Sequence, residues 1–81
     1  MCDYSLNSVS NRKIRYGGLI VRLVHRREDC EELLKNGGLL FSERFLLKKE
    51  IAILNEYIEL SQEYVENLAE IYEMLKTLEG S

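Results

Sequence analysis

The chain has 81 residues, of which 46% are hydrophobic and 31% charged, and its formal net charge is -3. This composition is typical of a folded protein and excludes a disordered or low-complexity chain, while the length allows one domain with a small core. Because a core of this size leaves little stability margin, we expect a second copy or another partner to contribute.

The sequence predicts a cytoplasmic protein with no membrane contact. No apolar run reaches transmembrane length, and residues 1–16 lack the continuous apolar core of a signal peptide. The two cysteines, Cys2 and Cys30, are too few for the disulfide framework of a small secreted protein. We interpret both as free thiols.

Positive charge gathers near the start of the chain. Residues 1–27 carry six Lys and Arg against one Asp, whereas residues 28–81 carry five against thirteen Asp and Glu. Such asymmetry indicates a surface for nucleic acid or another polyanion, although a solvated basic surface docked on an acidic helix is an equal alternative. The predicted nucleic-acid-binding residues are Arg12, Lys13, Arg15, Arg22, Arg26 and Arg27.

Residues 1–11 are mostly small and polar and predict a flexible N-terminal arm, followed by a single domain over residues 12–81. Residues 12–25 predict a β-hairpin, because two runs rich in β-branched and aromatic residues flank Gly17-Gly18, a pair suited to a two-residue turn. One strand over residues 19–24 after a flexible joint is the alternative.

The rest of the chain is predicted to be helical. Residues 28–36 favour a short helix, with acidic residues at its start and the sequence NGG at its end. A long helix is expected over residues 43–79, which contain neither Gly nor Pro. Ser42 would be its N-cap residue, with Phe41 and Leu46 forming a hydrophobic staple.

A heptad pattern in the long helix predicts self-association. Apolar residues recur at the two positions that form a coiled-coil interface, interrupted by Ser61, and their β-branched and leucine types favour two strands. We therefore expect an α+β, mostly α, protein whose long helices form a dimeric or higher coiled coil or bundle. The predicted oligomer interface comprises Leu47, Ile51, Leu54, Ile58, Val65, Leu68, Tyr72 and Leu75.

An additional apolar flank lies beside this heptad pattern. It carries Tyr57, Tyr64, Ile71 and Leu78, with Ile53, Leu60 and Met74 beyond them. We expect the short helix, further helices or a protein partner to cover this flank, since large exposed apolar patches are uncommon on soluble proteins.

Two stretches are similar to known families. The sequence LSQEYVENLAEIY resembles the S-Q-E-L-D helix signature of small phosphatases that act on sporulation response regulators, with Val65 in place of the aspartate. The expected strand, helix, helix order resembles ribbon-helix-helix DNA-binding proteins, whose dimers insert a two-stranded ribbon into the major groove. That resemblance implies Arg22 as the strand residue to examine for contacts with bases.

The sequence shows no pattern for catalysis. His25 is the only histidine, and no serine or cysteine stands in a recognised nucleophile motif or in a metal-ligand spacing. We expect neither an enzyme nor a cofactor or metal. The leading hypothesis is a small regulatory protein that binds nucleic acid through its basic β region, and the alternative is a protein-interaction adaptor that uses the aromatic flank.

Overall fold

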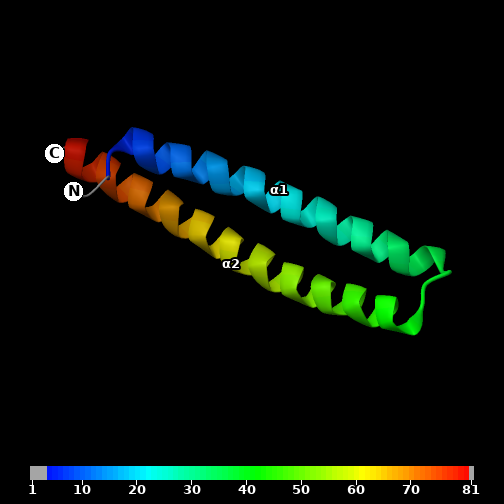
Figure 1. Cartoon of the computed structure of the whole chain (residues 1–81). Coiled ribbons are helices and arrows are strands. Elements are labelled where there is room, and N and C mark those ends of the chain that lie inside the picture. Colours follow the sequence, from blue (N-terminus) through cyan, green and yellow to red (C-terminus); the bar gives the residue numbers. More distant parts are fainter. Residues whose placement is uncertain (1–3, 81) are drawn as a thin grey trace.

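Two long antiparallel helices make up the described part of the chain (Figure 1). The computed structural model describes residues 4–80, with helix α1 at Leu6–Asn36 and helix α2 at Phe41–Gly80. The resulting rod measures 62 × 19 × 14 Å. The start of α1 and the end of α2 lie at one end of the rod, and the loop between the helices lies at the other.

The helices pack through one line of side chains from each, which we call the inner seam. On α1 this line follows a four-three spacing that starts at Leu6 and ends at Leu34, and every member is buried or half-buried. Val9 and Cys30 are fully buried on α1, while Leu54, Ile58 and Leu68 are buried on α2. The α1 residues of the inner seam are Leu6, Val9, Lys13, Tyr16, Ile20, Leu23, Arg27, Cys30 and Leu34.

The α2 half of the inner seam coincides with the heptad positions that the sequence assigns to an oligomer interface. All eight of those residues are buried or half-buried, and so is Ser61 between them. In this structure α1 of the same chain buries them, because α1 packs along α2 for most of its length. A contact of these residues with a second copy stays a prediction. The boundaries expected for the long helix agree with α2 to within two residues.

The predicted β-hairpin over residues 12–25 is wrong, because this segment is part of α1. Gly17 and Gly18 do not form a turn: the glycines with positive φ in the described residues are Gly37 and Gly38. Two glycines within a helix cost about 2 kcal/mol relative to alanine. Burying the inner-seam side chains that flank them, at about 0.8 kcal/mol per buried methylene, outweighs that cost.

The fold class is therefore all-α, and the α+β expectation is corrected. Residues 28–36, expected as a separate short helix, are the last turns of α1, and residues 6–11 of the expected arm are its first turns. Residues 1–3 lie outside the described part of the chain. Since no strand occurs in residues 4–80, the strand, helix, helix order behind the ribbon-helix-helix resemblance is also absent there.

The ends of both helices are held by local hydrogen bonds. Ser5 is the N-cap residue of α1, and its hydroxyl accepts a hydrogen bond of 3.1 Å from the amide of Ser8. At the start of α2, the Glu43 carboxylate accepts one of 2.9 Å from the amide of Leu40. Ser42 is thus inside the first turn and is not the N-cap residue. The expected staple is also absent, since Phe41 and Leu46 are both exposed.

Candidate interaction surface

A second line of apolar side chains runs along α2 beside the inner seam. Its residues follow the same four-three spacing from Ile53 to Leu78. Asn67 is the polar residue in this series. Two such lines on one helix are typical of a helix that packs against two neighbours in a bundle. We call this line the outer stripe, and its apolar members are Ile53, Tyr57, Leu60, Tyr64, Ile71, Met74 and Leu78.

Most of the outer stripe is open to solvent. The exposed fractions are 57% for Tyr57, 55% for Leu60, 64% for Met74 and 70% for Leu78. Tyr64 is half-buried, as is Ile71. Within one chain this flank stays open, because α1 reaches only its inner border. Its coverage by further helices or by a protein partner stays a prediction.

The outer stripe includes a shallow groove of about 200 Å³ in the middle of α2. Ile53, Tyr57 and Leu60 supply its apolar lining, and Glu56 lies at its edge. A groove bounded by aromatic and aliphatic side chains can hold an apolar side chain from a partner helix.

Tyr64 joins the outer stripe to α1. Its ring meets that of Tyr16 edge to face, with 4.7 Å between the centroids and 82° between the planes. Such a pair contributes about 0.5–1.5 kcal/mol beyond the area that it buries. The contact fixes the lengthwise alignment of the helices, with residue 16 opposite residue 64.

An ion pair links α1 and α2 between the Tyr16–Tyr64 contact and the loop. The Arg26 guanidinium donates two hydrogen bonds to the Glu50 carboxylate, from Nε at 2.6 Å and from Nη2 at 3.0 Å. Glu50 lies on the line of the outer stripe, seven residues before Tyr57, so Arg26 is on the same side of the rod as the stripe. The hydrogen bond from Arg26 lowers the pKa of Glu50.

Cys30 lies next to this ion pair in the inner seam. Its side chain is fully buried, and burial raises the pKa of the Cys30 thiol. A buried thiol held in its neutral form is a weak nucleophile and a poor metal ligand. Cys30 is therefore a packing residue of the seam.

Four of the six predicted nucleic-acid-binding residues, Arg12, Arg15, Arg22 and Arg26, lie on one edge of α1, and Lys13 and Arg27 lie beside them in the inner seam. Arg12 lies over the ring of Tyr4, and Lys13 lies over the ring of Tyr72. Arg26 is paired with Glu50, as described above.

Arg27, Arg15 and Arg22 complete the set. Arg27 donates a hydrogen bond of 2.8 Å to Asn55 and lies 3.6 Å from a Glu31 oxygen. Arg15 and Arg22 are exposed, and neither makes an ion pair within the described residues. The structure thus places two of the six basic residues freely in solvent on one edge, and it engages the other four with neighbouring side chains.

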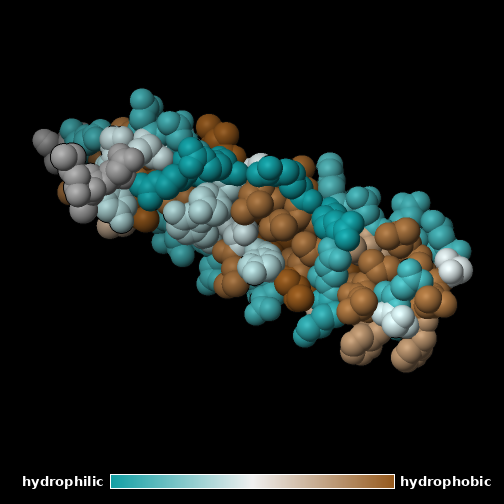
Figure 2. All heavy atoms as spheres, in the orientation of Figure 1, coloured by the Kyte–Doolittle hydropathy of each residue, from teal (hydrophilic) through white to brown (hydrophobic). Residues whose placement is uncertain are grey.

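The loop end of the rod carries a second apolar surface, which we call the loop-end patch. It comprises Leu40, Phe41, Phe45 and Leu46, with exposed fractions from 64% to 85%. Figure 2 shows hydrophobic side chains gathered at this end, along with others in the middle of the visible face. The density of Leu and Phe in residues 39–47 is a sequence signal for this patch that the heptad analysis misses.

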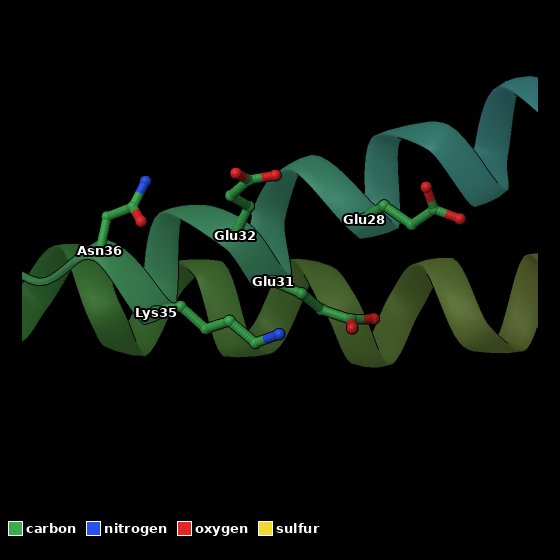
Figure 3. A pocket seen from close by; sticks show the side chains of 5 residues that line it. All are labelled: Glu28, Glu31, Glu32, Lys35 and Asn36. Carbon is green, nitrogen blue, oxygen red and sulfur yellow. The ribbon is translucent and has the colours of Figure 1, made fainter.

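A polar hollow of about 340 Å³ lies along the last turns of α1 (Figure 3). Glu28, Glu31, Glu32, Lys35 and Asn36 line it, and all five are exposed. The side chains of Glu32 and Asn36 point away from those of Glu31 and Lys35, so the carboxylates do not converge. This arrangement suits a solvated helix surface and offers no binding cage.

The described residues contain no arrangement for metal binding. No group of three His, Cys, Asp or Glu side chains lies close enough there to hold a metal ion, and His25 is exposed on α1. Within residues 4–80, neither helix is both long enough and apolar enough to cross a membrane.

Comparisons with protein-family models, with curated proteins and with solved structures find no match to this chain.

Proposed function

We propose that this chain is a protein-interaction adaptor and that the outer stripe of α2 binds a helix of its partner. The observation that carries the proposal is the exposed four-three line from Ile53 to Leu78. An α-helix with a matching apolar line can pack into it by knobs-into-holes geometry.

The nucleic-acid function predicted from the charge asymmetry has less support. A phosphate-binding surface needs several free basic side chains on one face, whereas Arg26 and Arg27 are already paired with carboxylates. Arg15 and Arg22 remain as an edge on α1 with room for a phosphate contact. Nucleic-acid binding therefore stays a second proposal, which fluorescence anisotropy with duplex and single-stranded oligonucleotides at low salt would test.

Site-specific photo-crosslinking tests the adaptor proposal. A benzoylphenylalanine residue placed at position 57, 60 or 74 in living cells should crosslink to one discrete protein, which mass spectrometry then identifies. The matched control is the same residue at position 62, where Gln62 is exposed on α2 outside the outer stripe. Equal crosslinking at positions 60 and 62, or none at any stripe position, would contradict the proposal.

A further inference from the structure

We propose that the helix bound by the outer stripe is α1 of a second copy, which gives a four-helix bundle whose twofold axis runs parallel to the rod. This inference rests on the proposed function and names the partner. In the bundle, α1 of each copy lies antiparallel along the outer stripe of the other, and the two loop ends lie side by side.

The accessible surface of the single chain is larger than that of a compact monomer, which supports a second copy as the partner. Its accessible surface is 6350 Å². A compact monomer of 9.5 kDa exposes about 5,000 Å², so the hairpin exposes roughly a quarter more. A stable protein interface buries about 800 Å² on each partner, and the rod has that area to bury.

The face of α1 that adjoins the outer stripe is basic. Arg15, Leu19, Arg22 and Arg26 follow a four-three spacing and so form one edge of α1. Because Arg26 contacts Glu50 at the border of the stripe, this edge and the stripe lie on the same side of the rod. That side therefore combines an arginine edge on α1 with an apolar line on α2.

The outer stripe has an acidic border on the side away from the inner seam. Glu56, Glu63 and Glu70 each precede a residue of the stripe by one position, and all three are exposed. The arginines on α1 and these glutamates on α2 both repeat every seven residues, Arg15 with Arg22 and Glu56 with Glu63. The two edges can therefore pair along their length.

The alignment within one chain predicts which residues meet between chains. A twofold axis parallel to the rods leaves the position of each residue along the rod the same in both copies. The Tyr16–Tyr64 contact sets residue 16 opposite residue 64. Arg15 of one copy then lies near Tyr64 and Glu63 of the other. Seven residues along, Arg22 lies near Tyr57 and Glu56. Each guanidinium thus meets an aromatic ring and a carboxylate together.

The other closed arrangement of two hairpins has its twofold axis perpendicular to the rod. It would place α2 against α2, with Glu56, Glu63 and Glu70 of one copy facing the same residues of the other. It would also place the arginine edges of the two α1 helices together. Like charges would therefore face each other along the α1–α1 and the α2–α2 contacts. Their repulsion disfavours this arrangement.

Charge reversal measured by sedimentation equilibrium tests the inference. The wild-type chain should have twice its monomer mass of 9.5 kDa at micromolar concentration. R15E/R22E and E56R/E63R should each lose the dimer, because like charges then face each other across both α1–α2 contacts. The quadruple variant R15E/R22E/E56R/E63R should regain it, since every pair is again opposite in charge.

The control for altered net charge is K35E/K48E. It changes the charge by the same amount as R15E/R22E, at exposed residues outside both edges, and should keep the dimer. Circular dichroism should show unchanged helix content in every variant. A wild-type monomer, or a quadruple variant that stays monomeric while fully helical, would overturn the inference.

Spin labels at the loop end test the direction of packing. With Cys2→Ser to remove a competing thiol, a label on Ser42→Cys should report a short distance between the two copies. A distance near the 62 Å length of the rod would show the perpendicular arrangement and overturn the inference. A monomer whose position 57 still crosslinks to a different protein would overturn this inference and keep the proposed function.

Discussion

Glycine has two different structural roles in this chain, one inside α1 and one in the loop. Gly17 and Gly18 lie within α1, where an added Cβ would meet no atom within 4 Å beyond the local backbone of the helix, while Gly37 and Gly38 hold the positive φ angles of the loop. Gly37 combines φ 74° with ψ -166°, a conformation essentially restricted to glycine.

Alanine substitutions at these glycines should therefore change stability in opposite directions. Gly18→Ala should stabilise the fold by about 0.5–1 kcal/mol, because alanine has the higher helix propensity. Gly37→Ala should destabilise it by about 1–3 kcal/mol through backbone strain. Thermal unfolding followed by circular dichroism measures both, and destabilisation by Gly18→Ala would contradict a helix at that position.

The Arg26–Glu50 ion pair should make stability depend on pH in the acid range. The pKa of Glu50 in the folded chain lies below its ordinary value of 4.5, owing chiefly to the hydrogen bond from Arg26. The ion pair therefore stabilises the fold above pH 4.5, and this contribution is lost as the pH falls through the lowered pKa. Because both side chains are partly exposed, the effect should be small.

The variant Glu50→Gln isolates this effect. The melting temperature of the wild type should exceed that of Glu50→Gln near neutral pH, and the difference should shrink below pH 4.5. Glu66→Gln, at an exposed glutamate of the same helix that lies outside the outer stripe and its acidic border, is the control. A difference that stays constant from pH 7 to about pH 3 would mean that the Glu50 carboxylate does not contribute as a charge.

At the scale of the helices, the inner seam supplies the burial that holds α1 against α2. The five buried hydrophobic residues of the described chain lie along the seam, at both ends of α1 and through the middle of α2. Hydrophobic contacts along a line are the main source of stability for a pair of helices, since isolated helices are marginal in water. Seam residues and outward-facing residues should therefore differ sharply in their tolerance of substitution.

Leu68→Ala should cost about 2–5 kcal/mol, because the Leu68 side chain is only 1% exposed and its removal leaves a cavity. A fold of this size has little stability in reserve, so loss of cooperative unfolding is also an expected outcome. The control is Ile14→Ala, at a residue that is 71% exposed and outside the outer stripe, with an expected change within about 0.5 kcal/mol. Urea titration compares them, and equal effects would contradict the assigned seam.

At the scale of the whole molecule, the hairpin is extended rather than compact. Its radius of gyration is 18.0 Å, against about 12 Å for a compact chain of 81 residues. Much of its apolar side-chain surface therefore lies outside the inner seam, in the outer stripe and the loop-end patch. From this distribution we expect association to influence stability more than in a globular domain of equal length.

The melting temperature should rise with protein concentration if association contributes to stability. Mass action favours the folded state when folded chains bind each other, so a hundredfold increase in concentration should give a measurable upward shift. R15E/R22E, which lacks the proposed dimer contacts, should show no shift over the same range. Differential scanning calorimetry provides the test, and a concentration-independent wild type would contradict the expectation.

The sequence by itself determined the long C-terminal helix, its heptad line and the apolar flank beside it, because a regular spacing over some 30 residues is a strong local signal. It could not assign residues 12–25 correctly. There β-branched residues and a glycine pair favour a hairpin locally, whereas the side chains of Tyr16, Ile20 and Leu23 are half-buried in the inner seam against α2.

Only the tertiary structure decided that α1 fills the inner seam and leaves the outer stripe open. The same heptad line suits a helix from the same chain or from a second copy, and the short loop favours the first by keeping α1 close to α2. Likewise, the sequence showed where the arginines are, but only the packing of α1 on α2 brought Arg26 to Glu50 and left Arg15 and Arg22 on a free edge.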